Sequence, residues 1–278
     1  TLAFTGAPPS GTNNVYVVHQ AKAVGTIDPA VGSTLDLNGA AELILDADGD
    51  TAISADAADD QIDIKIGGND DFKLTAKTLS IGGAAAADSK IVFDGNAQDY
   101  HIGLDDSADD LVIGLGSTLG TTSHIVIDEA GHVTKPLQPA FMANKSASGQ
   151  TPSANTATTV VFENEVFDNN ADYNNSNYTF TAPVTGRYWF HTRIRVDEVG
   201  GGTGIYSVRL VASNRTIHNT QVDLSDYLDG TMNRMTFTCT GLLDMDASDT
   251  CKVQVYEDSG YEIEDEVEET YFMGYLVC

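Results

Sequence analysis

The segment VFENEVFDNNADYNNSNYTFTAPVTGRYWF, residues 161–190, constrains the fold more than any other part of the sequence. Its aromatic residues lie at uneven intervals, with an asparagine-rich polar run between them. Tyr188 and Phe190 alternate as side chains on one face of a β-strand do, and we expect Phe162 to project into the same core. We therefore interpret the aromatic spacing as packing rather than as ligand stacking. Recognition is assigned to the polar loop between the aromatic residues.

Alternating runs of large residues continue after Pro139 and predict a β-sheet domain. The strands expected there are 158–162, 178–181, 187–196, 206–211, 235–243, 251–256 and 271–277. Strands at this spacing, with no helical period between them, favour an antiparallel sandwich or jelly roll. Gly186 follows Pro183, and we expect it in a tight turn where a side chain would not fit.

Seven positions in this domain resemble the signature of a known family. They are Phe162, Asp168, Tyr173, Phe180, Gly186, Tyr188 and Phe190. Their spacing resembles that of the globular head of the first complement component, a family that shares a ten-stranded jelly roll with tumour necrosis factor. Thr192 stands where the family has an aromatic residue.

Two further segments are similar to the same family, so that the resemblance covers about half of the chain, residues 139–278. Residues 243–255 (LDMDASDTCKVQV) resemble its penultimate hairpin, with Ser248 in place of the usual glycine and Cys251 in place of a core valine. Residues 271–277 (YFMGYLV) resemble its final strand.

Before residues 136–139 the sequence is repetitive and rich in Gly, Ala and Asp. Its strand-like runs are short, at 61–66, 72–75, 91–93, 111–115 and 125–127. Three apolar residues followed by Asp and a turn recur in LILDADG, IVFDGNA and IVIDEAG, and ADDQIDI returns as ADDLVIG 50 positions later. Since the spacing of these echoes varies, we do not assign a regular solenoid.

Strands this short have too few large side chains to close a core within one chain. Three chains around a common axis would bury them, and we therefore predict a homotrimer. The predicted fold class is all-β, with an extended anchoring arm at 1–40, an intertwined β-rich stalk at 41–135 and a complement-type jelly-roll head at 136–278. 

Charge and composition exclude several classes of function. The net charge of -27, from 41 acidic and 14 basic residues, disfavours binding to nucleic acid and to anionic membranes. No run approaches the roughly 20 apolar residues of a membrane span, so we expect no membrane insertion. Few lysines and abundant Asp fit a marine or halophilic setting. Cys239, Cys251 and Cys278 are interpreted as buried core residues.

No catalytic constellation is evident, and we predict that the protein is not an enzyme. The six histidines are scattered, without metal-ligand spacing or a neighbouring nucleophile motif. Asp46, Asp48 and Asp50 alternate as carboxylates in calcium loops do, which makes calcium a candidate ligand. Because the bidentate glutamate of such loops is missing, a hairpin turn is the favoured interpretation.

Four acidic loops are expected to lie together at the end of the head that is remote from residue 139. These loops, 168–177, 197–204, 223–232 and 257–269, contain 15 acidic residues and no Lys or Arg. The candidate contacts for calcium or a receptor are Asp168, Asp172, Tyr173, Asp197, Glu198, Asp226, Tyr261, Glu264 and Asp265. Tyr173 and Tyr261 would offer stacking faces. The alternative is a solvated acidic rim without a ligand.

These features together favour a virion surface protein, a tail fibre or receptor-binding spike of a bacterial or archaeal virus, assembled in the host cytoplasm. The arm would bind a virion tail or capsid protein, and the head a host surface glycan or protein. One alternative is a capsid decoration or vertex spike that stabilises the shell. Another is a cellular surface adhesin, which the lack of a signal peptide and of a disulfide framework disfavours.

Overall fold

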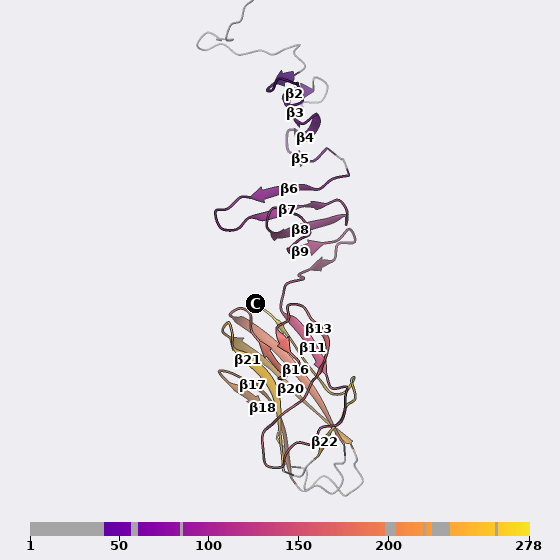
Figure 1. Ribbon diagram of the computed structural model, residues 1–278, viewed down its shortest axis with the longest axis vertical. Helices are drawn as coiled ribbons and strands as arrows, with labels where there is room; N and C mark the ends of the chain where they lie inside the picture. Colours follow the sequence, from indigo (N-terminus) through magenta and orange to yellow (C-terminus); the bar gives the residue numbers. More distant parts are fainter. Residues whose placement is uncertain are drawn as a thin grey trace, which may run out of the picture. The chain divides into compact units, whose positions relative to one another are not determined.

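A computed structural model describes residues 42–56, 61–83, 86–197, 204–218, 221–223, 234–258 and 261–278. Every element in these residues is a β-strand, which confirms the all-β prediction (Figure 1). Among them there is no helix with the length and apolar character needed to cross a membrane. The predicted arm, residues 1–40, lies outside the described residues. Contacts divide the chain into residues 1–80 and 81–278, while the predicted boundary near residue 136 stays a prediction.

The first described strands form a five-stranded antiparallel meander in chain order. Its strands are β1 (Glu42–Ile44), β2 (Ala52–Asp56), β3 (Gln61–Ile66), β4 (Asn69–Leu74) and β5 (Leu79–Ile81). A second five-stranded meander follows, again with each strand beside the next. Its strands are β6 (Ser89–Phe93), β7 (Tyr100–Asp105), β8 (Asp110–Leu115), β9 (Ser123–Ile127) and β10 (Val133–Thr134).

The sequence echoes fall at equivalent places in the two meanders. LILDADG and IVFDGNA each span the end of the first strand of a sheet, and the QIDI and LVIG segments lie in the third strands. IVIDEAG spans the end of β9, where Asp128 Oδ1 accepts hydrogen bonds from the backbone N–H of Ala130 and His132. Asp46 Oδ1 accepts one from Gly49 in the same way. In these two of the three echoes, a strand is thus followed by a turn that an aspartate stabilises.

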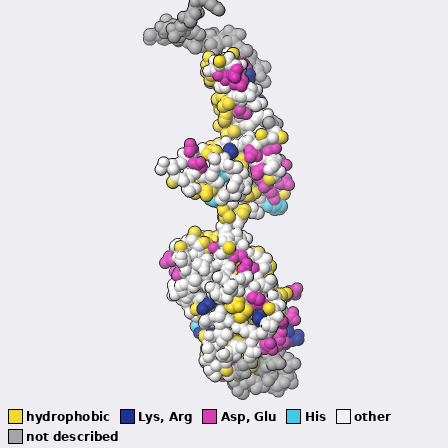
Figure 2. Space-filling model, viewed as in Figure 1, with side chains coloured by type: hydrophobic (Ala, Val, Ile, Leu, Met, Phe, Trp, Pro, Cys, Tyr) yellow, Lys and Arg dark blue, Asp and Glu magenta, His cyan; other side chains and the backbone are white. Residues whose placement is uncertain are grey.

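Both meanders leave large apolar side chains exposed in the single chain. The exposed set is Leu43, Ile44, Leu45, Ile53, Ile62, Ile66, Leu74, Leu79, Ile91, Phe93, Tyr100, Leu104, Leu111 and Val133. Figure 2 shows such side chains on the surface of these sheets. A single sheet has no second layer to cover its apolar face, which is the reason the sequence argument expected association.

Residues 140–278 form a sandwich of two antiparallel sheets, as predicted. The first has the order β13-β11-β23-β16-β20, with β22 beside β16. Its strands are β11 (Ala140–Asn144), β13 (Asn164–Asp168), β16 (Gly186–Asp197), β20 (Arg234–Met245), β22 (Glu262–Ile263) and β23 (Tyr271–Leu276). The first and last strands of the domain are neighbours in this sheet, as in a jelly roll.

The second sheet has the order β14-β15-β21-β17-β18, with β12 beside β21 and β19 beside β17. Its strands are β12 (Thr158–Thr159), β14 (Tyr173–Asn174), β15 (Thr179–Thr181), β17 (Ile205–Ala212), β18 (Thr216–His218), β19 (Val222–Asp223) and β21 (Thr250–Glu257). The two sheets enclose one core between their inner faces.

Aromatic rings fill the centre of this core. Phe162, Tyr188 and Phe190 are fully buried there. Phe141, which the sequence did not single out, lies among as many rings as Phe190: its centroid is 4.9 Å from that of Tyr173 and 5.0 Å from those of Phe180 and Phe272. Thr192, at the position where the family has an aromatic residue, is buried, and its hydroxyl donates to the Tyr271 carbonyl.

Two sequence interpretations need correction. Gly186 is the first residue of β16 rather than a turn residue, and a Cβ there would lie 2.7 Å from Leu276 Cδ1 and 2.8 Å from the Cys278 carbonyl oxygen. The glycine is therefore needed for close approach of the last strand.

Cys239 and Cys251 are buried as expected, but Cys278 is exposed because it lies beyond the end of β23.

Ser248 has φ +76° in the turn between β20 and β21, a left-handed conformation that favours glycine. Ser248→Gly should raise the free energy of unfolding by about 1 kcal/mol, because it removes the contact between Cβ and the backbone. Chemical denaturation measures this. Ala247→Gly, at the preceding residue, where φ is not positive, should lower stability by about 0.5 kcal/mol. A loss of stability in Ser248→Gly would contradict the prediction.

Candidate functional site

The two ends of the sandwich carry different loops. We call the end with Ala140, Gly186 and Leu276 the proximal pole, and the end with Asp197 and Tyr271 the distal pole. In Figure 1 the chain's C-terminus lies at the proximal pole, and β22 lies near the distal one. Register defines these ends, since Trp189 pairs with Tyr275 near one end of β16 and Arg193 pairs with Tyr271 further along it.

The structure places Asp168 at the proximal pole, so the prediction that all four acidic loops share the distal pole is wrong. Phe141 lies opposite Asp168 in the β11–β13 pair, and β13 therefore ends where β11 begins. Asn169 and Asn170 donate side-chain hydrogen bonds to the carbonyls of Gln138 and Leu137. The cause of the error is β13, which the sequence argument did not detect. One missing strand reverses the end at which the next loop lies.

Asp168 stabilises its own loop. Its Oδ1 accepts the Asp172 N–H at 3.2 Å, and its Oδ2 accepts the Tyr173 N–H at 2.8 Å. Burial raises the pKa of Asp172. Tyr173 is buried in the core and donates its hydroxyl to the Phe162 carbonyl at 2.9 Å, so it offers no stacking face.

At the distal pole the fold gathers acidic side chains around one buried arginine. Arg195, whose side chain is 8% exposed, donates from Nε and Nη2 to the two oxygens of Asp197 at 3.0 and 3.1 Å. Its Nη1 lies 3.0 Å from Glu269 Oε2 and 3.6 Å from Glu266 Oε1. Arg234 reaches the same Asp197 at 3.2 Å. The guanidinium groups of Arg195 and Arg234 thus neutralise part of the negative charge at the distal pole, which weakens its attraction for cations.

The carboxyl groups of Asp197 and Glu264 interact in this cluster, and each influences the pKa of the other. Burial acts to raise the pKa of Asp197, but hydrogen bonds and charge from Arg195 outweigh it and hold that pKa below its usual value. Burial, followed by the negative charge of Asp197, raises the pKa of Glu264. The fold therefore favours ionised Asp197 and disfavours ionised Glu264.

The remaining candidates of this pole are separated in the structure. Asp265 is exposed. Tyr261 is only 3% exposed, so the expectation that it offers a stacking face is wrong, because its ring packs in the core. Glu198 and Asp226 lie outside the described residues. Cation binding at this pole stays a prediction.

Arg195→Met should lower the free energy of unfolding of the head by about 2 kcal/mol, because it leaves Asp197 partly buried without its bidentate partner. The exposure of Glu266 and Glu269 moderates the loss. Chemical denaturation of the purified chain measures it. Arg234→Met is the control, with an expected loss below about 0.5 kcal/mol, since its side chain is 69% exposed. Equal losses in both variants would contradict the structural role of Arg195.

Asp46, Asp48 and Asp50 come together in the exposed turn between β1 and β2. One ligand atom from each carboxylate lies within 4.8 Å of the others. Hydrogen bonds, first from the Thr51 side chain and also from the Gly49 backbone, lower the pKa of Asp46 to about 2. The hydrogen bond to Asp46 raises the pKa of Asp50. The turn joins two paired strands, as the hairpin interpretation expects, and calcium there stays a prediction.

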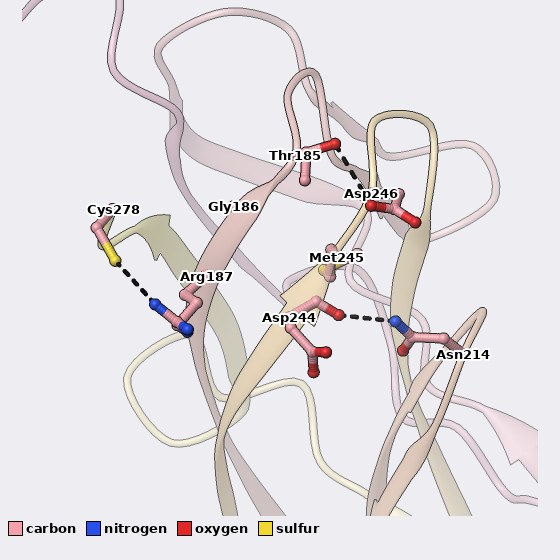
Figure 3. Close-up of a pocket in the computed structure, with 8 residues that line it drawn as sticks. All are labelled: Thr185, Gly186, Arg187, Asn214, Asp244, Met245, Asp246 and Cys278. Atoms are coloured by element: carbon pink, nitrogen blue, oxygen red, sulfur yellow. Dashed lines mark hydrogen bonds between the residues drawn. The ribbon is translucent and has the colours of Figure 1, made fainter.

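A pocket of about 370 Å³ opens at the proximal pole (Figure 3). The residues lining it are Thr185, Gly186, Arg187, Asn214, Asp244, Met245, Asp246 and Cys278. Their polar groups bind one another: Asn214 Nδ2 donates to the Asp244 carbonyl at 2.7 Å, and Arg187 Nη1 lies 3.9 Å from Cys278 Sγ. No histidine is among the described residues that line this pocket.

The outer face of the first sheet carries a group of aromatic and apolar side chains, which we call the aromatic face. It comprises Met142, Phe167, Trp189, His191, Leu242, Tyr271, Met273 and Tyr275, all from strands β11, β13, β16, β20 and β23. Trp189 and Tyr275 are paired across β16 and β23, with ring centroids 5.4 Å apart. Tyr275 is 46% exposed and Leu242 52% exposed.

Sequence reasoning missed the aromatic face, although a signal was present. Trp189 and His191 alternate with the core residues Tyr188 and Phe190, so β16 carries rings on both of its faces. Strands that are apolar on both faces are covered on both faces in folded assemblies. The described residues of the single chain provide no layer over this outer face.

The family comparison agrees with this architecture. The C1q domain family matches residues 140–277. The C-terminal half of the chain is thus a C1q-type head, as the resemblance implied. Domains of this family are non-enzymatic binding and structural modules that typically form homotrimers and bind other proteins.

Among solved structures, the head is similar to the globular domain of zebrafish complement 1qA protein, at 16% identity over 51% of this chain and 98% of that chain, with a TM-score of 0.37. Murine APRIL is 10% identical over 50% of this chain and 99% of its own, with a TM-score of 0.38. Eiger TNF from S. frugiperda is 10% identical over 51% and 94%, with a TM-score of 0.39. A search of curated proteins found no match.

Proposed function

We propose that the protein is a homotrimeric, non-enzymatic surface fibre of a bacterial or archaeal virus, which attaches the particle to its host through the C1q-type head. The observation that carries the assembly is the aromatic face. Three copies of Trp189, Tyr275 and Leu242 would be buried if the first sheets of three heads met around an axis. Head domains of this family typically form homotrimers, which supports the same arrangement.

The two meanders support a projecting fibre rather than a catalytic domain. They consist only of short strands and turns over their described residues, and their exposed Leu and Ile side chains require partners. Association with two further copies would cover these side chains, whereas a monomer would expose them to water. The residues before β1 would attach the fibre to the virion tail or capsid.

The experiment that tests this function combines assembly with attachment. Sedimentation of the purified full chain should give the mass of three chains, and the trimer should adsorb to cells of its host from a panel of candidate bacteria and archaea. Adsorption is measured with calcium and with a chelator, since acidic residues at Asp46 and at the distal pole are candidate cation ligands. A monomer would overturn the assembly. Adsorption to no cell, with gold-labelled antibody decorating the shell of particles, would favour a capsid decoration protein.

The stability of the trimer should fall as the pH falls through about 6.5, the ordinary pKa of histidine. Burial, with the charge of Arg193, lowers the pKa of His191 in the folded state, so below that pH the unfolded chain binds more protons at this site. His191 Nδ1 lies 2.7 Å from Thr240 Oγ1 and its ring packs near Trp189 and Tyr271.

His191→Gln should reduce this pH dependence, because glutamine does not titrate. Thermal unfolding of the full chain at about pH 7.5 and about pH 5.5 measures the difference between the two proteins. His132→Gln is the control, since the His132 side chain is 76% exposed in a turn after β9. The same pH dependence in wild type and His191→Gln would contradict the prediction.

A further inference from the structure

The outer face of the second sheet carries basic side chains and no acidic ones over strands β15, β17, β18 and β21. Its outward, at least partly exposed residues are Thr179 and Thr181, Ile205, Arg209 and Val211, Thr216 and His218, and Thr250, Lys252, Gln254 and Tyr256. We call these residues the cationic face. Asp223 of the edge strand β19, opposite Ile205 of β17, lies at the margin of the same outer face. In a chain with 41 acidic residues, the positive group on the four other strands requires a physical explanation.

Register brings the two cations of this face close together. Arg209 on β17 lies opposite Gln254 on β21 and opposite His218 on β18. Lys252 lies two residues from Gln254 along β21 and is thus the diagonal neighbour of Arg209, a relation that places Cβ atoms about 7 Å apart. Two adjacent strands therefore carry a pair of positive charges on half-buried side chains at the outer face of the sheet.

These cations have no carboxylate partner among the described residues, unlike most arginines of the head. Arg193, Arg195, Arg215 and Arg234 each form an ion pair with Asp or Glu. Arg209 and Lys252 form none with any residue that the structure describes, and Arg209 Nε has no hydrogen-bond partner within that same set. Their charge remains available to an external anion. Figure 2 shows how sparse basic side chains are on the visible surface compared with acidic ones.

The neighbouring side chains indicate which anion fits. Thr179 pairs with Lys252, and Gln254 Nε2 donates to Thr159 Oγ1 at 3.5 Å, so hydroxyl and amide groups surround the two charges. Such groups exchange hydrogen bonds with sugar hydroxyls, and the Tyr256 ring offers a stacking surface. An arginine fork binds a carboxylate or sulfate group in a bidentate manner.

We propose that the cationic face binds an acidic polysaccharide with carboxylate or sulfate groups on the host surface. A sheet face is extended rather than concave, which suits a polymer better than a small molecule. An acidic protein fits less well, because the face lacks the cluster of large apolar anchors that protein interfaces use. Nucleic acid carries a much denser charge than two cations on a chain of net charge -27 can neutralise.

This inference rests on the proposed function, since it names the ligand class for the attachment step. In the proposed trimer the aromatic face is buried between copies, and the cationic face, on the other sheet, stays exposed in each copy. Three equivalent faces on one polymer would strengthen binding through effective concentration.

The test measures binding of the full chain to immobilised alginate, dextran sulfate and neutral dextran at about 150 mM NaCl, where charges interact over about 8 Å. Arg209→Gln combined with Lys252→Gln should weaken binding to the acidic polymers by at least about tenfold. The control combines Arg215→Gln with Arg234→Gln, which changes net charge equally but removes arginines already paired with Asp244 and Asp197. Its binding should stay within about twofold of wild type.

Three outcomes would overturn the inference: wild type binding neither acidic polymer, both double variants losing binding equally, or soluble polyglutamate competing as well as alginate does. Thermal unfolding of both double variants checks that they fold. Sedimentation of the same samples measures the number of chains in the assembly, so that failure of the polysaccharide site can be distinguished from failure of the proposed trimer. A trimer that binds no acidic polymer overturns the polysaccharide site alone, whereas a monomeric wild type overturns the proposed assembly.

Discussion

Trp189→Ser combined with Tyr275→Ser should convert the trimer into monomers at micromolar concentration. Both rings lie on the aromatic face, paired across β16 and β23 with centroids 5.4 Å apart. Burial of one large aromatic side chain stabilises an assembly by about 2 kcal/mol. The double variant removes two rings from each of three chains. The lost free energy of association is therefore several times larger than the effect of one substitution in a monomer. Sedimentation equilibrium measures the mass directly.

Tyr256→Ser combined with His218→Ser is the matched control for this variant. These residues lie on the outer face of the other sheet, so the control should sediment as wild type does. Circular dichroism should show the same strand content in all three proteins, because Trp189 and Tyr275 are not core residues. A trimer in the aromatic-face variant, or a monomer in the control, would contradict the assignment of this face.

Much of the head could be predicted because apolar and polar residues alternate along the sequence of its longest strands. The runs predicted at 187–196, 235–243 and 251–256 match β16, β20 and β21 to within a few residues at each end. Each of these strands carries a side chain toward the core at every second position, so burial and periodicity agree.

β11 and β13 could not be predicted in the same way. All five residues of β13 (NEVFD) remain at least partly exposed, so no buried face imposes a period of two on its sequence. β11 is short and ends in the buried polar residue Asn144, whose carboxamide binds Asn164 and the Val267 carbonyl. Only tertiary pairing defines these strands, and omitting β13 placed Asp168 at the wrong pole.

The candidate site residues likewise fall into two groups, those with local partners and those with partners far away in the sequence. Single-residue features such as the Asp46 turn are visible in a local sequence window, since their partners lie within a few residues. The cluster around Arg195 joins residues of β16 to Glu266 and Glu269, about 70 positions later, and no periodicity signals that contact. The cationic face likewise depends on the register between β17 and β21. Charge pairing between distant segments is a property of the fold.

Phe141→Ala should lower the free energy of unfolding of the head by about 4 kcal/mol, the largest loss expected from one core substitution here. The Phe141 ring is fully enclosed and contacts rings from both sheets, including Tyr173 and Phe180 from the second sheet and Phe272 from the first. Removing it leaves a cavity that rigid aromatic neighbours cannot fill, since each is already fixed by its own strand. Denaturant titration of the full chain, followed by tryptophan fluorescence, measures the loss.

Val184→Ala is the control for the loss of apolar volume, because Val184 is 47% exposed, and its expected cost is below about 0.5 kcal/mol. Phe141→Leu should recover part of the lost stability, since leucine fills part of the cavity in the same hydrophobic surroundings. If Phe141→Ala cost less than about 1 kcal/mol, the ring would not join the two sheets as described. The two sheets would then be held together mainly by other core residues, among them Phe162, Tyr188 and Phe190.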